Sequence, residues 1–120
     1  MTLAALATGL AWLGVAITAG LALLCLRNPV EGLKHISHHP DQLPEVMEGR
    51  YLAFFGFSLF ATLYGDFTVI AVWALALSFM AFADTFIYVR AGKSIWRHAL
   101  AGIAGLGVAA VAFAAANGAN

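Results

Sequence analysis

Residues 67–90 read FTVIAVWALALSFMAFADTFIYVR, and this stretch decides the fold class. Before the final Arg90 it is apolar, apart from three small hydroxyl residues and one carboxylate, Asp84. An apolar run of this length is typical of a membrane-spanning helix. A carboxylate inside such a helix is costly, so Asp84 marks a candidate functional site whose partner has to be found.

The composition of the whole chain favours the same environment. The 120 residues are 62% hydrophobic and 10% charged. A soluble domain of this length leaves too much of its surface in water to hide so much apolar area. Six basic residues balance six acidic ones, which argues against a nucleic-acid partner. The single cysteine, Cys25, excludes an internal disulfide and a CxxC redox pair.

The sequence predicts four membrane spans in one domain, residues 1–120. Gly65 and Asp66 are the residue types that end one helix and cap the next, and Gly92 and Ser94 repeat this signal. Links this short make consecutive spans antiparallel neighbours. The predicted spans cover about residues 3–26, 44–64, 67–90 and 95–116.

The longer connection, residues 27–43, is predicted to contain a short helix. Asn28 and Pro29 are typical of an N-cap and a first helical position. The apolar residues that follow recur at three-residue spacing, which makes this helix amphipathic and places it at the membrane interface. The expected fold is an all-α, integral membrane four-helix bundle with a short interfacial helix between spans one and two.

The basic residues predict the orientation in the membrane. All six Lys and Arg residues lie in or beside the 27–43 connection and the Gly92 link, and none lies near the two termini or the Gly65-Asp66 link. The positive-inside rule therefore makes the 27–43 connection cytoplasmic and leaves both termini outside the cytoplasm. The expected location is the cell inner membrane, with membrane lipid as the surrounding partner.

Three polar residues on consecutive spans, Arg50, Asp84 and His98, form the leading candidate site. At the rise of an α-helix they lie about 21, about 24 and about 27 Å from the outer ends of their spans. This similar depth lets Arg50 pair with Asp84, which offsets the cost of burying either charge. A pair that only fixes helix register is the alternative interpretation.

Helical faces indicate where these side chains point. His98 is followed by small residues at spacings of four, seven and eleven, which is typical of a helix–helix contact. Asp84 shares its face with Tyr88, whereas Glu48 points away from Arg50 and is a second-rank candidate. The predicted ligand-binding residues are therefore Arg50, Asp84, His98, Glu48 and Tyr88.

His35, His38 and His39 form a weaker candidate, for a metal site. On one helix they would share a face with Glu31, a spacing that can ligate zinc, copper or nickel. The segment ends at Pro40 and lacks a complete metal motif, so a solvated interfacial segment is the simpler interpretation. The spans have no central His for haem and the chain has no phosphate loop, so we expect no cofactor.

At Gly49-Arg50, Asp84 and His98 the chain resembles the small four-helix membrane proteins of the DoxX-like superfamily. Within it, the chain is similar to a bacterial and fungal family of unknown function. That family also has a Gly-Arg opening span two, a Gly-Asp link, an Asp late in span three and a His early in span four. The resemblance covers about residues 6–112 and implies a four-helix bundle without supplying a reaction. It suggests a redox-complex subunit or an accessory membrane protein, but the chain lacks a cysteine pair for redox chemistry.

The predicted function is binding of a small amphiphile, such as a lipid, an isoprenoid or a quinone, at a polar pocket near the cytoplasmic leaflet. Arg50 would hold an anionic or carbonyl head group, Asp84 would orient Arg50, and His98 would add a hydrogen bond or move a proton. One alternative is a non-catalytic accessory subunit of a membrane complex. As protein partners, a homo-oligomer and a larger membrane complex are both left open. Another is a small membrane enzyme or proton-coupled carrier that uses Asp84 and His98.

Overall fold

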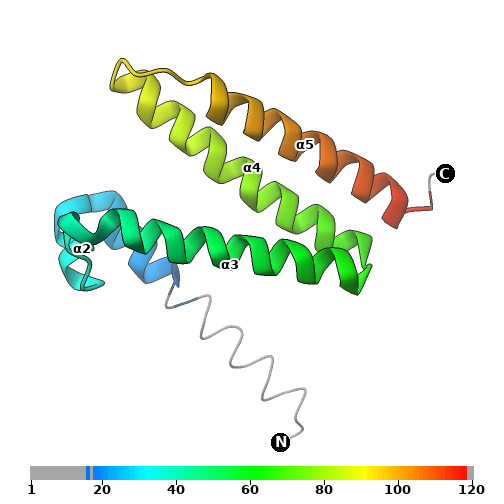
Figure 1. Ribbon diagram of the computed structural model, residues 1–120, viewed down its shortest axis with the longest axis horizontal. Coiled ribbons are helices and arrows are strands. Elements are labelled where there is room, and N and C mark those ends of the chain that lie inside the picture. The colour runs from blue at the N-terminus through cyan, green and yellow to red at the C-terminus, as the bar shows by residue number, and fades with distance from the viewer. Residues whose placement is uncertain (1–15, 17, 119–120) are drawn as a thin grey trace, which may run out of the picture. The chain divides into compact units, whose positions relative to one another are not determined.

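The computed structural model describes residue 16 and residues 18–118 (Figure 1). Every regular element in this part of the chain is helical, so the all-α prediction is confirmed. The contacts divide the chain into two compact units, Met1–Arg50 and Tyr51–Asn120. The helices are Thr18–Arg27, α2 (Pro29–His35), the 3-10 helix η1 (Pro40–Gln42), α3 (Leu43–Tyr64), α4 (Phe67–Arg90) and α5 (Trp96–Ala116).

The first unit contains the predicted short helix. Asn28 caps α2 by accepting a hydrogen bond from the backbone N–H of Glu31 at 3.3 Å, and Pro29 occupies the first turn, as predicted. Gly32 is buried because α2 runs close to the preceding helix: a Cβ there would lie 2.7 Å from the Sγ of Cys25. The predicted first span, 3–26, falls mostly outside the described residues, and its last part, within Thr18–Arg27, is helical.

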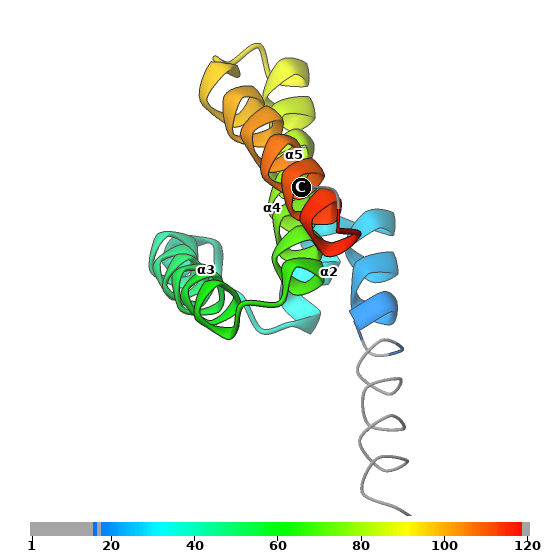
Figure 2. The ribbon, with the colours of Figure 1, turned by 90° about the vertical axis from the view of Figure 1, so that its right-hand side faces the viewer.

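The second unit is built on α4 and α5, which lie side by side and antiparallel (Figures 1 and 2). Small residues make this contact possible. A Cβ at Gly105 would lie 2.9 Å from the Cβ of Ser78 and 3.2 Å from the backbone oxygen of Ala74, so the two backbones are close. Gly102 and Ala109 are buried on the same face of α5. The predicted helix–helix face is confirmed, and the small-residue stripe of α5 is used within the chain.

The links in this unit follow the sequence in two places and depart from it in one. Gly65 takes a left-handed φ of +77°, and the carboxylate of Asp66 accepts hydrogen bonds from the N–H groups of Thr68 at 2.8 Å and Val69 at 3.3 Å. Gly92 is also left-handed, with φ +65°. Ser94 does not start α5, because Ile95 is the N-cap and no side chain caps the helix. The prediction for Ser94 was therefore wrong.

A tryptophan joins α3 to α4. The indole N–H of Trp73 donates a 2.7 Å hydrogen bond to the hydroxyl of Ser58. The same ring packs against Phe57, with centroids 4.5 Å apart, and against Phe54 at 5.8 Å. This contact satisfies the only polar atom of the indole and leaves its apolar face for packing.

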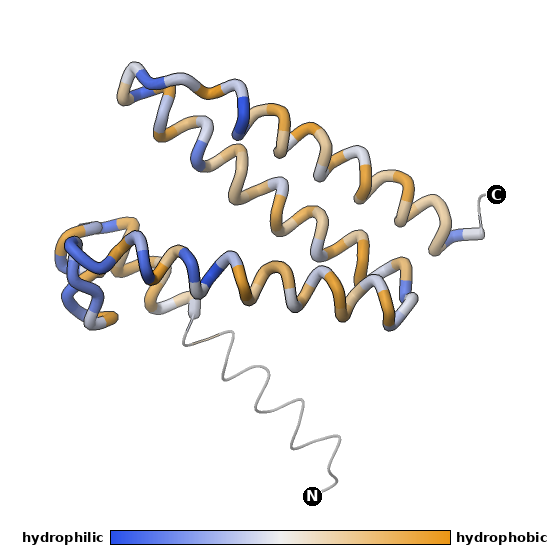
Figure 3. The backbone as a smooth tube through the Cα atoms, in the orientation of Figure 1, coloured by the Kyte–Doolittle hydropathy of each residue, from blue (hydrophilic) through white to orange (hydrophobic). Residues whose placement is uncertain are grey.

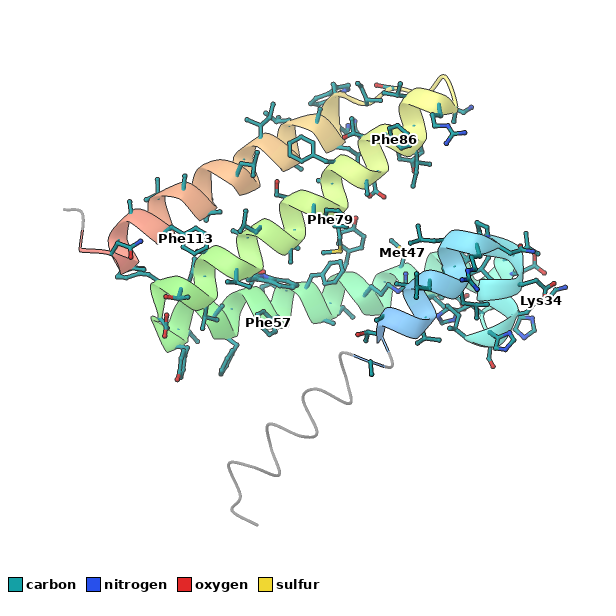
Figure 4. The ribbon with its side chains drawn as sticks, turned by 180° about the vertical axis from the view of Figure 1, so that it is seen from behind. Lys34, Met47, Phe57, Phe79, Phe86 and Phe113 are labelled. Atoms are coloured by element: carbon teal, nitrogen blue, oxygen red, sulfur yellow. The ribbon has the colours of Figure 1, made fainter. Side chains whose placement is uncertain are left out.

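Two of the described helices, α4 and α5, are long and apolar enough to cross a membrane, judged by length and composition alone. Figure 3 shows both as mostly hydrophobic, with polar residues gathered at the turn between them. In their most apolar windows only 22% of α4 and 17% of α5 is buried, unlike the core helix of a soluble protein. Two of the exposed side chains, Phe79 at 75% and Phe86 at 62%, are labelled in Figure 4. The helix bounds match the predicted spans 44–64, 67–90 and 95–116 to within one residue, and the four-span bundle stays a prediction.

Candidate functional site: a cavity with a polar end

A cavity of about 560 Å³ lies among α3, α4 and α5 in the second unit. Most of its wall is apolar, and all three helices contribute to it. The larger apolar side chains of the wall are Phe54, Ile70, Trp73, Leu77, Met80 and Val108. A volume of this size is in the range of small-molecule sites, which are mostly apolar with a few polar groups that orient the ligand.

The polar end of the cavity is formed by Asp84 of α4 and His98 of α5. The Oδ2 atom of Asp84 and the Nδ1 atom of His98 are 3.7 Å apart, so the two form an ion pair when the imidazole is protonated. The side chain of Asp84 is 47% exposed and that of His98 is 33% exposed. Both groups are therefore open to a ligand while they stay in reach of each other.

The aromatic ring of Tyr88 packs against the imidazole of His98. The two rings stack, with centroids 4.9 Å apart and planes at 30°. Tyr88 lies one helical turn beyond Asp84 on α4, so both partners of His98 come from the same face of that helix. The structure thus brings together three of the predicted site residues, Asp84, Tyr88 and His98.

The other two predicted residues, Arg50 and Glu48, belong to the first unit. There, Nη2 of Arg50 lies 3.5 Å from Nε2 of His38, and the Arg50 side chain is exposed. Glu48 is exposed as well. The pairing of Arg50 with Asp84 stays a prediction.

The histidine segment does not form the single helix that the weaker, metal-site candidate would require. α2 ends at His35, and Ser37 turns the chain with a left-handed φ of +58°. His38 and His39 therefore do not share a helical face with Glu31, so the shared face that this candidate required is absent. Within the described part of the chain, no three His, Cys, Asp or Glu side chains are grouped so that they could hold a metal ion.

Several wall residues were missed by the sequence analysis. Ala101, Ala104 and Val108 line the cavity on α5, and Tyr51 and Ser58 line it on α3. Ala101, Gly105 and Val108 follow His98 at three- and four-residue steps, so this second face of α5 was visible in the spacing. The wall residues of α3 could not be recognised from spacing, because their place in the wall depends on how α3 packs against Trp73.

Comparison with protein-family models, with curated proteins and with solved structures finds no match. The resemblance to the DoxX-like superfamily therefore stays a prediction. In the site, an apolar wall leads to one carboxylate and one imidazole, and a tyrosine ring stacks on the imidazole.

Proposed function

We propose that this protein is an integral membrane protein that binds a small amphiphile, such as a lipid, an isoprenoid or a quinone, in the cavity among α3, α4 and α5. The proposal includes the four-span bundle, the inner-membrane location with both termini outside the cytoplasm, and the relation to the DoxX-like superfamily. The head group would lie against Asp84 and His98, and the tail would lie along the apolar wall.

The observation that carries the proposal is the division of the cavity wall. Asp84 and His98 are its charged and imidazole groups, and the remaining wall is largely aliphatic and aromatic. An amphiphile has the same division between a polar head and an apolar tail, so it can satisfy both parts of the wall at once. A purely polar ligand would leave the apolar part in contact with water or empty.

The exposed side chains of α4 and α5 support a lipid environment for this cavity. Large apolar residues such as Phe79, Ile103 and Val111 project outward from the two helices and are more than half exposed. Exposed apolar area of this kind is unfavourable in water at roughly 25 cal/mol per Å². Lipid chains would remove that cost and would also bring amphiphiles to the open side of the cavity.

The test is to fill the cavity and to count what copurifies. Ala104 lines the cavity, whereas Ala110 is exposed on the same helix and is not part of this cavity wall. Ala104→Phe and Ala110→Phe therefore add the same side chain inside and outside the cavity. Each variant is extracted in mild detergent, and its bound amphiphiles are measured per mole of protein by mass spectrometry.

We expect the wild-type protein and Ala110→Phe to retain a stoichiometric amphiphile that Ala104→Phe loses. Helix content from circular dichroism must stay equal among the three proteins. The proposal is wrong if Ala104→Phe retains the same molecules. It is also wrong if the wild-type protein neither copurifies with a stoichiometric amphiphile nor binds one that is supplied.

A further inference from the structure

We propose that the cavity selects amphiphiles with a cationic, N–H-donating head group, such as a primary ammonium, over anionic ones. This inference rests on the proposed function and narrows its ligand class. It reverses the charge expected from the sequence, where Arg50 was predicted to hold an anionic or carbonyl head group.

The first argument is the unused bonding capacity of Asp84. None of the hydrogen bonds among the residues that the structure describes involves its carboxylate, and its nearest charged partner, Nδ1 of His98, is 3.7 Å away. An ionised carboxylate has room for about four donors. It is half exposed and lines the cavity, so a donor on the ligand can reach it.

The second argument is the charge of the wall. The titratable side chains of the wall are Asp84, His98 and Tyr51. The part of the wall that the second unit contributes contains no Lys or Arg. Within the second unit, a carboxylate or phosphate head group would meet the charge of Asp84 with no Lys or Arg of the wall to offset it. An ammonium carries three N–H donors, enough for the carboxylate and for Nδ1 of an unprotonated His98. Charge-assisted hydrogen bonds of this type are roughly twice as strong as neutral ones.

The third argument is the path for the tail. Along α4, Asp84 and Trp73 are separated by about 16 Å at the rise of an α-helix. Met80 and Leu77 line the cavity between them. The indole N–H of Trp73 is already bonded to Ser58, so the ring offers only an apolar surface to the tail. An alkyl chain of that length, with its amine at Asp84, ends beside Trp73.

This geometry gives a direct assay, because Trp73 can report the end of the tail. The chain has three tryptophans, so a Trp12→Phe, Trp96→Phe background leaves Trp73 alone. The protein is placed in phosphatidylcholine vesicles at neutral pH, so that no second protein contributes tryptophan fluorescence. It is titrated with ω-bromododecylamine, ω-bromododecanol or ω-bromododecanoic acid, whose bromine quenches indole fluorescence on contact.

We expect the amine to reach half-maximal quenching at a concentration at least tenfold below that of the acid. Asp84→Asn removes the charge at constant size and should abolish this preference, while Asp84→Glu should keep it. Asp41→Asn is the matched control, because it removes an exposed carboxylate from η1 in the first unit and should leave the preference unchanged. Circular dichroism checks that each variant is folded.

Failure of this inference is distinguishable from failure of the proposed function. If the acid quenches as well as the amine, or if the preference survives Asp84→Asn, the cationic selectivity is wrong. The proposed function then stands, provided that Ala104→Phe still removes saturable quenching. If no probe quenches saturably, or if Ala104→Phe changes nothing, the amphiphile cavity itself is wrong.

Discussion

The hydroxyl of Ser78 donates a 2.7 Å hydrogen bond to the backbone oxygen of Gly102 and so joins α4 to α5 inside their contact. Ser78 is only 1% exposed, and its side chain is the largest of those that are fully buried among the described residues. Interhelical hydrogen bonds of this kind are worth about 1 kcal/mol in membrane proteins.

Replacing this serine gives the first prediction. Ser78→Ala should lower the free energy of unfolding by about 1 kcal/mol, because it removes the bond and leaves a small gap. Equilibrium unfolding in mixed micelles of SDS and a mild detergent, followed by far-UV circular dichroism, measures the change. Ser94→Ala at the exposed α4–α5 turn is the control and should change stability little. Equal effects of the two variants would contradict the role of Ser78.

The two glycines at 105 and 107 provide a matched pair. A Cβ at Gly105 would press on Ser78 and on the backbone of Ala74, whereas a Cβ at Gly107 meets nothing within 4 Å. Gly105→Ala should therefore destabilise the protein by about 1–3 kcal/mol, since overpacking moves the helices apart. Gly107→Ala should be neutral or should stabilise it by up to about 1 kcal/mol, because alanine favours the helix. The same unfolding assay decides, and a stable Gly105→Ala protein would argue against the close α4–α5 contact.

The bond between Trp73 and Ser58 predicts a measurable coupling between α3 and α4. Trp73→Phe and Ser58→Ala each remove one partner of the 2.7 Å bond, and the double variant removes both. A double-mutant cycle should give a coupling energy of about 1 kcal/mol. Additive effects would mean that α3 is held by the aromatic contacts alone. Phe57→Leu, which weakens the ring contact and keeps the hydrogen bond, separates these two contributions.

The sequence predicted the bounds of α4 well, because local chemistry sets both of its ends. α4 has the predicted bounds, since Asp66 caps its start and the left-handed Gly92 follows its end. The face of α5 marked by Gly102 was also predictable, because only small residues allow helices to approach this closely. The left-handed conformation of Ser37 was not predictable, since it has no clear sequence signal, and it turns the chain between the end of α2 and His38.

The sequence predicted the part of the candidate site that helical spacing determines, and it did not predict the opposite wall. Asp84, Tyr88 and His98 stand at helical spacings on two helices whose contact the glycines fix, so their meeting follows from the sequence. The opposite wall depends on Ser58 and Trp73, whose bond joins residues far apart in the chain. No local pattern encodes that bond, and the cavity that it helps to shape could not be predicted without it.

The turn between α4 and α5 allows the predicted orientation to be tested. Arg90 and Lys93 lie at this turn, and positively charged turns are kept on the cytoplasmic side of the membrane. The link at Gly65 has no basic residue. In a Cys25→Ser background, Tyr64→Cys should therefore react with a membrane-impermeant maleimide added to intact spheroplasts. Ala91→Cys should react only after the membrane is broken, because α4 would carry it to the cytoplasmic side. The reverse pattern would mean the opposite orientation. Labelling of both cysteines in intact spheroplasts would mean that α4 does not cross the membrane, and the exposed apolar side chains of this helix would then need a protein partner to cover them.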